Sequence, residues 1–150
     1  RAFQDPGGVN NSARLEQAVK LTSHLAGAVA AGSVVVIGGD LNAPPTKASM
    51  NPFYALDAPG QRGTGRYFEA DQDDSRYYSP DCAPDAGACR SGAVTLGPRG
   101  AGASAGTQKY DYVFFSETSA PASVSGLPLD NPSSDHALFR ASIEIATAPP

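Results

Sequence analysis

The feature that most constrains the fold is a helix-length segment that leads directly into a β-branched segment. Residues 11–31 place apolar or small side chains on one helical face, namely Leu15, Ala18, Val19, Thr22, Leu25, Ala26 and Val29. Asn11 or Ser12 can cap the start of this helix, and Gly32 follows its end. Residues 33–37 then predict a short strand that is buried on both faces. A helix followed by a buried strand predicts an α/β fold.

The rest of the chain adds further elements of both kinds. Residues 48–56 predict a short helix, and residues 66–70 predict a short strand. The aromatic and β-branched segment 110–116 predicts another strand. Residues 137–145 alternate apolar and polar side chains, which predicts a strand with one buried and one wetter face. Glycine, proline, alanine and serine dominate residues 79–108, so we expect a long mobile loop there.

Length and charge limit the classes of protein. The 150 residues suffice for one domain with one core, and we treat 1–150 as a single domain. The formal net charge of -4 provides no overall basic field for nucleic acid or anionic membranes. No stretch approaches 18 apolar residues and Arg1 does not open a signal sequence, so we expect a mature or trimmed chain with no membrane insertion.

The cysteine pair bears on the cellular compartment. Cys82 and Cys89 lie in the turn-rich segment DCAPDAGAC, which is short enough to close as a small disulfide loop. No further cysteine or nearby histidine completes a tetrahedral metal site. We therefore expect a disulfide and a secreted or extracytoplasmic protein, with two independent thiols as the alternative.

Three polar clusters lie at the ends of predicted strands, where sites form in α/β sheets. Asp40 and Asn42 follow the first strand, and a carboxylate with an amide can orient a water, contact a phosphate oxygen or help to hold a divalent cation. His136 follows Asp135 directly before the last strand, and it needs a carboxylate partner to act near neutral pH. Asp111 is the candidate partner.

Structural readings of the same residues stay open. Asp40 and Asn42 are also typical of a turn that satisfies its own backbone, and Asp111 and Asp135 are also typical of surface acids. A histidine such as His136 is often structural. Glu69 and Asp71 are alternative metal ligands, although the sequence favours a solvated turn that contains both residues.

The motifs GDLN (39–42), KYDYVFFS (109–116) and SDH (134–136) occur in that order. With them, the sequence resembles the endonuclease/exonuclease/phosphatase superfamily, which includes pancreatic deoxyribonuclease, abasic-site endonucleases, sphingomyelinases and inositol-phosphate phosphatases. The segments ARLEQAVKL and GRYFEADQDD resemble the surroundings of the first motif. The resemblance implies half of a four-layer α/β sandwich, with a mixed, mostly antiparallel sheet and helices on one face.

The resemblance also implies a function, that of a metal-dependent phosphoester hydrolase acting on phosphodiesters. Asp40 would then position the attacking water, and Asn42 would contact the scissile phosphate. His136, oriented by Asp111, would act as general base or stabilise charge on the phosphate. The family metal is Mg²⁺, or Mn²⁺ in its place, and here Asp40, Asn42 and Asp135 would contribute to binding it.

The sequence departs from the family pattern in length. The family's first half, which supplies an asparagine, a metal-binding glutamate and a histidine in a THL-like strand, has no counterpart, so the chain resembles the C-terminal half only. We expect the principal metal ligand in that N-terminal half and an incomplete catalyst without it. The C-terminal half of a sandwich on its own exposes an apolar strand surface. We therefore expect the N-terminal half, or a second copy of this chain, to cover that surface. His24 mimics the missing motif but lies in the predicted helix.

Two alternatives and the substrate remain open. The chain is also compatible with a catalytically silent scaffold or binding fragment. Ser104 in GASAG, with Asp111 and His136, matches the order of a serine hydrolase, but the required strand before and helix after the serine are not predicted. Nucleic acids, lipid phosphodiesters and sugar phosphates are all candidate substrates. The basic residues that we expect to line a local phosphate groove are Arg62, Arg66, Arg76 and Lys109.

Overall fold

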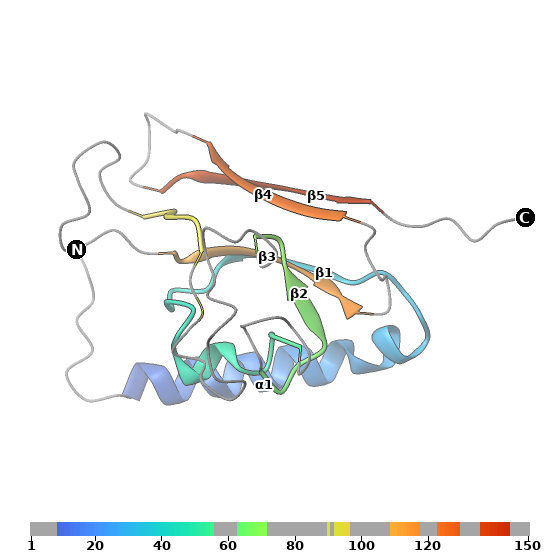
Figure 1. Cartoon of the computed structure of the whole chain (residues 1–150). Helices are drawn as coiled ribbons and strands as arrows, with labels where there is room; N and C mark the ends of the chain where they lie inside the picture. The colour runs from blue at the N-terminus through green and yellow to red at the C-terminus, as the bar shows by residue number, and fades with distance from the viewer. Residues whose placement is uncertain are drawn as a thin grey trace, which may run out of the picture.

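The computed structural model describes residues 9–55, 63–71, 90, 92–96, 109–117, 123–129 and 136–144. The elements are helix α1 (Val9–Ala30), strand β1 (Val36–Asp40), the 3-10 helix η1 (Ala48–Met50), and strands β2 (Tyr67–Glu69), β3 (Asp111–Ser116), β4 (Ser123–Leu129) and β5 (Leu138–Glu144). Figure 1 shows α1 running along one side of the strands, with β4 and β5 on the opposite side. The predicted α/β class is confirmed.

The strands form two antiparallel groups. Three strands pair in the order β1-β3-β2, and β4 pairs with β5. The register of β1 on β3 places Val36 opposite Phe115 and Asp40 opposite Asp111. β3 also contacts β5, so the two groups meet next to the central strand. The antiparallel character agrees with the prediction, whereas the four-layer sandwich and the partner that would complete it stay predictions.

Helix α1 begins two residues before the predicted caps and ends as predicted. Gly32 has a φ of +80°, its N–H donates to the carbonyl oxygen of Val29, and the N–H of Ser33 donates to that of Ala28. This is the double hydrogen bond of a Schellman ending. The buried face is narrower than predicted, because Ala18 and Val29 are buried whereas Leu15 and Val19 are exposed. In the described part of the chain, no helix has the length and apolarity needed to span a membrane.

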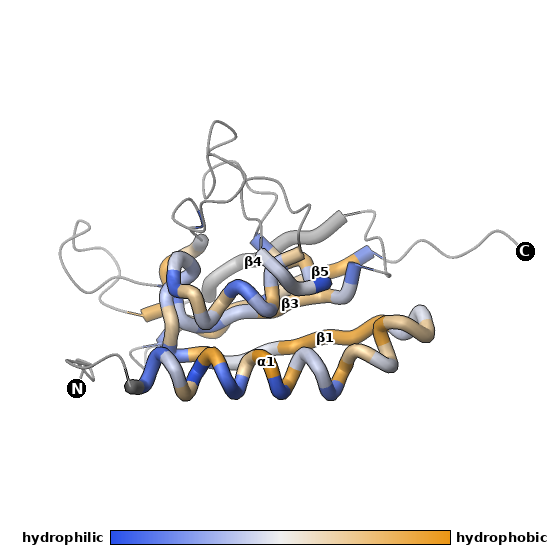
Figure 2. The backbone as a smooth tube through the Cα atoms, turned by 90° about the horizontal axis from the view of Figure 1, so that it is seen from below, coloured by the Kyte–Doolittle hydropathy of each residue, from blue (hydrophilic) through white to orange (hydrophobic). Residues whose placement is uncertain are grey.

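Strand β1 lies three residues further along the chain than predicted and includes Asp40. Its prediction as a strand buried on both faces is wrong: Ile37 faces α1 and is buried, whereas Val36 is 55% exposed. β1 is an edge strand of its sheet, and α1 runs alongside it (Figure 2). Val36, Gly38 and Asp40, which share the face of β1 opposite Ile37, are exposed.

The four later predictions have different outcomes. The predicted helix over 48–56 is wrong beyond η1, because Tyr54 and Ala55 instead form parallel bridges with Tyr67 and Gly65. The strands predicted over 66–70 and 110–116 are confirmed as β2 and β3. The alternation predicted for β5 is also confirmed, with Leu138 60% exposed and the next residue partly buried. β4 was not predicted, and its Gly and Pro residues weaken its strand signal.

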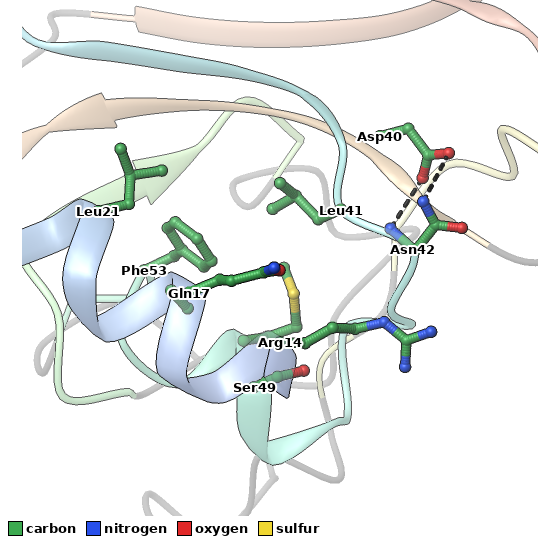
Figure 3. Close-up of a pocket in the computed structure, with 10 residues that line it drawn as sticks. Arg14, Gln17, Leu21, Asp40, Leu41, Asn42, Ser49 and Phe53 are labelled. Atoms are coloured by element: carbon green, nitrogen blue, oxygen red, sulfur yellow. Dashed lines mark hydrogen bonds between the residues drawn. The ribbon is translucent and has the colours of Figure 1, made fainter. Parts of the chain in front are cut away.

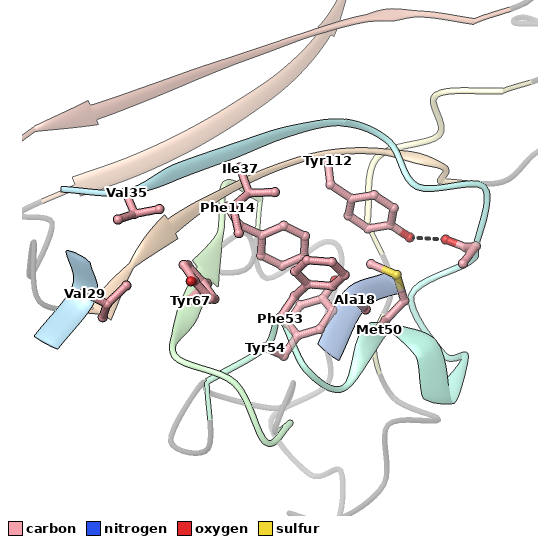
Figure 4. Packing of buried hydrophobic residues seen from close by; sticks show 11 residues of the cluster. Ala18, Val29, Val35, Ile37, Met50, Phe53, Tyr54, Tyr67, Tyr112 and Phe114 are labelled. Carbon is pink, nitrogen blue, oxygen red and sulfur yellow. Dashed lines mark hydrogen bonds between the residues drawn. The ribbon is translucent and has the colours of Figure 1, made fainter. Parts of the chain in front are cut away.

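The core lies between α1 and the three-stranded sheet and centres on Phe114. The ring of Phe114 stacks on Phe53 and Tyr112, with centroids 5.2 and 5.6 Å away, and meets the edge of Tyr54 at 5.1 Å. Figure 4 shows these rings between the sheet and the helix. Offset and edge-on aromatic pairs stabilise beyond the burial of their area. The core therefore anchors β3, the strand that begins with Asp111.

Candidate functional site

Two acidic residues lie opposite each other at one end of the sheet. Asp40 ends β1, Asp111 begins β3, and the two residues are direct partners in the ladder. The N–H of Leu41 donates to the carbonyl oxygen of Tyr110 at 2.9 Å, so the neighbouring pair is the hydrogen-bonded one. Asp40 and Asp111 thus form a non-hydrogen-bonded pair, the kind in which side chains on one face are closest. The antiparallel register brings together two residues that are distant in the sequence.

The loop after β1 holds Asp40 and Asn42 in one fixed turn. One carboxylate oxygen of Asp40 accepts the backbone N–H of Asn42 at 2.8 Å, and the other accepts its side-chain amide at 3.1 Å (Figure 3). Asn42 has a φ of +50°, a left-handed conformation that asparagine tolerates better than most residues. Gly39, within β1, has a φ of +148°, a backbone conformation that glycine adopts more readily than other residues.

The pairing predicted for His136 and Asp111 is present in the structure. The Nδ1 atom of His136 lies 2.8 Å from Oδ2 of Asp111, and both side chains are partly exposed. His136 also forms an isolated antiparallel bridge with Leu96 just before β5. A carboxylate at Nδ1 orients the ring and leaves Nε2 as the atom for proton transfer. The catalytic role of the pair stays a prediction.

Thr95 is a residue of the site that sequence reasoning missed. Its Oγ1 accepts the N–H groups of Tyr110 and Asp111 at 2.9 and 3.0 Å, while its carbonyl oxygen accepts the N–H of Ala137 at 2.7 Å. Thr95 is fully buried and connects the segment before β3 with the segment before β5. It therefore holds both Asp111 and His136 in place.

Thr95 lies inside the stretch 79–108, which the composition predicts to be a mobile loop. The described residues of that stretch are Arg90 and 92–96, and three of them, Arg90, Ala93 and Thr95, are buried. This part packs against the sheet. No sequence signal distinguishes Thr95, because its role depends on hydrogen bonds across 15 and 16 residues.

Tyr112 provides a second connection that the sequence did not reveal. Its hydroxyl donates to the carbonyl oxygen of Ala43 at 2.7 Å and lies 3.1 Å from the carbonyl oxygen of Lys109. Ala43 follows Asn42, and Lys109 precedes Asp111 by two residues. Burial raises the pKa of Tyr112, so the hydroxyl keeps its proton. The hydroxyl thus connects the segment after β1 with the segment before β3, and these segments adjoin the two acids.

The prediction of a solvated turn for Glu69 and Asp71 is wrong. Both residues are 1% exposed, and Nζ of Lys109 lies 3.1 Å from Oε1 of Glu69 and 3.0 Å from Oδ2 of Asp71. Gly92 makes room for the lysine, since a Cβ there would lie 2.3 Å from Cδ of Lys109. Burial raises the pKa of Glu69 well above its ordinary value, and the Lys109 ammonium offsets this in part. The cluster is an interior anchor and not a set of metal ligands facing solvent.

The described residues do not form the basic phosphate groove that we expected. Lys109 is buried in the cluster above, and Arg66 pairs with Glu117 on the surface. Arg62 and Arg76 lie outside the described residues. His24 lies within α1, as predicted, and is exposed.

Several predicted residues lie outside the described part of the chain and are not placed. They are Asp135, Ser104, Cys82 and Cys89. Within the described ranges, no group of three or more histidine, cysteine or acidic side chains is arranged to hold a metal ion. The oxygen donors of Asp40, Asn42 and Asp111 are nevertheless the hard ligands that Mg²⁺ and Mn²⁺ prefer. The donor chemistry fits such an ion, and the described residues supply only part of a coordination sphere.

The chain matches a known protein family. The family model described as "Endonuclease/Exonuclease/phosphatase family" matches residues 5–136. No curated protein matches the chain. No solved structure matches it either. The matched segment contains both acids of the strand pair, the asparagine after β1 and the histidine before β5.

Proposed function

Because the chain belongs to the Endonuclease/Exonuclease/phosphatase family, whose members are in general hydrolases of phosphoesters, we propose that it contributes to metal-dependent hydrolysis of a phosphodiester. The observation that carries the proposal is the opposition of Asp40 and Asp111 across the β1–β3 ladder. Asn42 extends one side of this acid pair and His136 the other. An amide donor, two carboxylates and an imidazole therefore border one small region.

The chain's own residues have distinct tasks in this proposal. Asp40 accepts a hydrogen bond from the attacking water and orients its lone pair. The amide of Asn42 uses one hydrogen on Asp40 and offers the second to a phosphate oxygen. Asp111 holds Nδ1 of His136, so that Nε2 takes a proton from the water or stabilises charge on the phosphate.

Family enzymes commonly use divalent metals, and we propose Mg²⁺, or Mn²⁺ in its place, for this chain. Asp40, Asn42 and Asp135 would contribute oxygen ligands, together with a carboxylate from outside the described residues. Such an ion supplies positive charge to the phosphoryl oxygens when it is bound. We also propose an extracytoplasmic location and a disulfide between Cys82 and Cys89. Alkylation of the thiols before and after reduction, with the mass of the protein as the readout, would test the disulfide.

The test of the proposed function is cleavage of bis-p-nitrophenyl phosphate by the natural full-length protein that contains this chain, with Mn²⁺ or with a chelator. We expect metal-dependent release of p-nitrophenol that Asp40→Ala abolishes. Glu117→Gln removes a carboxylate from a surface pair with Arg66 and serves as the matched control. Equal rates for the wild type, Asp40→Ala and a buffer blank would contradict the proposal and favour the scaffold alternative.

A further inference from the structure

A cavity adjoins the acid and amide of the site on the helix side of β1. It has a volume of about 430 Å³ and lies between the first half of α1, the end of β1 and η1. Asp40 and Asn42 form part of its wall, so a ligand held by those residues can extend into it (Figure 3). Cavities of this size are typical of small-molecule sites. No sequence pattern predicts this cavity, because its walls come from three separate elements.

The lining of the cavity is divided between apolar and polar groups. Leu21, Leu41, Met50 and Phe53 provide apolar surface. Ser49 is 4% exposed and also lines the cavity, and its Oγ has no hydrogen-bond partner among the described residues. An unsatisfied buried hydroxyl is costly, so one that borders a cavity indicates a ligand or water that completes it.

Arg14 supplies a positive charge at the edge of this cavity. Its side chain is partly buried and extends its guanidinium toward the loop that carries Asn42 (Figure 3). Its contact is a hydrogen bond of 3.3 Å from Nη1 to Oδ1 of Asn11, and within the described ranges no carboxylate pairs with it. A guanidinium with this much free donor capacity suits a phosphate, which it can bind through two parallel hydrogen bonds.

We infer that the cavity is a subsite for one ester arm of the substrate, and that Arg14 binds a second phosphate group carried by that arm. The inference rests on the proposed function, because it places the scissile phosphate at Asp40 and Asn42. The substrate class is then a phosphodiester that bears a further phosphoryl group. Both a nucleotide chain and a phosphorylated sugar or lipid head group provide that chemistry. The apolar wall formed by Leu21, Leu41 and Phe53 suits a flat nucleobase on the same arm.

Binding of product-like ligands tests the inference without requiring turnover. Isothermal titration of the full-length chain compares thymidine 3′,5′-bisphosphate with thymidine 5′-monophosphate. We expect Arg14→Gln to weaken the bisphosphate by about tenfold to a hundredfold, the range for hydrogen bonds to a charged group, and to leave the monophosphate nearly unchanged. Arg14→Lys keeps the charge and should recover part of the affinity. Arg140→Gln, an exposed arginine on β5, is the matched control and should change neither ligand.

A second pair of ligands separates the two sources of a second phosphate. Inositol 1,4-bisphosphate carries two phosphates and no base, and its binding should also depend on Arg14. Tighter binding of the nucleotide would identify a nucleic-acid arm, and tighter binding of the inositol compound a sugar-phosphate arm. An equal loss for bisphosphate and monophosphate in Arg14→Gln, or no loss for either, would overturn the subsite.

Failure of the subsite and failure of the proposed function are distinguishable. Metal-dependent cleavage of bis-p-nitrophenyl phosphate without any Arg14 dependence of bisphosphate binding would leave the function and remove the subsite. Arg14-dependent binding without cleavage would leave the subsite and remove the function. Melting temperatures of the Arg14 variants show that each variant is folded during the titrations.

Discussion

Asp40 on β1 lies directly opposite Asp111 on β3, and each acid has a different local partner. Asp40 accepts two hydrogen bonds from Asn42, whereas Asp111 contacts the imidazole of His136. Like charges on directly opposed positions of a ladder repel each other, so the pair favours cations nearby. The environment thus separates two chemically similar carboxylates into two roles, one toward the amide and one toward the histidine.

Replacing the carboxylate of Asp111 tests the orientation of His136. Asp111→Asn keeps the size of the side chain but removes the negative charge beside Nδ1. If His136 acts as general base, we expect phosphodiesterase activity to fall by about 10²-fold to 10⁴-fold, the usual contribution of such a group. The rate of bis-p-nitrophenyl phosphate cleavage with Mn²⁺ measures this. His136→Asn in the same background should add little further loss, and a full additional loss would contradict a shared role.

Substituting Asn42 by glycine and by alanine separates the effect of its backbone conformation on stability from the effect of its amide on activity. Asn42→Ala keeps a Cβ in a left-handed conformation but removes the polar side chain through which asparagine tolerates it, at a cost of up to about 1–2 kcal/mol in the free energy of unfolding. Asn42→Gly accepts that conformation, so its stability should stay closer to that of the wild type. Both variants lose the amide, and both should lose activity. Urea unfolding and the cleavage assay measure the two properties, and an active Asn42→Gly protein would exclude a role for the amide.

Tyr112 and Tyr54 are both buried against Phe114, so removing each hydroxyl in turn tests the hydrogen bond of Tyr112. Tyr112→Phe leaves the carbonyl oxygens of Ala43 and Lys109 without this donor and should cost about 1–3 kcal/mol of unfolding free energy. The hydroxyl of Tyr54 is buried and has no hydrogen-bond partner among the described residues, so Tyr54→Phe should be neutral or stabilising. Chemical denaturation gives both values. Similar losses in the two variants would show that the bridge between the loops contributes nothing specific.

The buried carboxyl of Glu69 makes stability depend on pH. Its pKa is raised in the folded state by burial, so above the ordinary glutamate value of about 4.3 the folded chain holds a proton that the unfolded chain has released. The contribution of Glu69 is therefore fully present below that value and is lost as the pH rises through the raised pKa.

We expect Glu69→Gln to reduce this decline, which for one proton amounts to at most about 1.4 kcal/mol per pH unit. Urea unfolding at several pH values between 5 and 8 measures the slope. Glu16→Gln, on the exposed side of α1, is the control and should keep the slope of the wild type. Identical slopes for the wild type and Glu69→Gln would mean that Glu69 does not carry this pH dependence.

Strands β3 and β5 and the Asp111–His136 contact follow patterns that are visible in the sequence. Aromatic and β-branched residues defined β3, and a period of two defined β5. The exact start of β1 was less predictable, because a β-branched run does not show where its ladder begins. The exposure of Val36 was not predicted for a related reason. Whether the second face of a strand is buried depends on a neighbouring layer, and the sequence of the strand does not show whether that layer is present.

The sequence by itself determined the α/β class, the helix ending at Gly32 and the residue types needed for phosphoester chemistry, because these depend on local periodicity, backbone preference and functional groups. Only the tertiary structure placed Asp40 opposite Asp111, buried Lys109 between Glu69 and Asp71, and brought Thr95 and Tyr112 to the two loops of the site. These contacts join segments that lie far apart in the chain. Strand register and desolvation decide them, and both are properties of the assembled sheet.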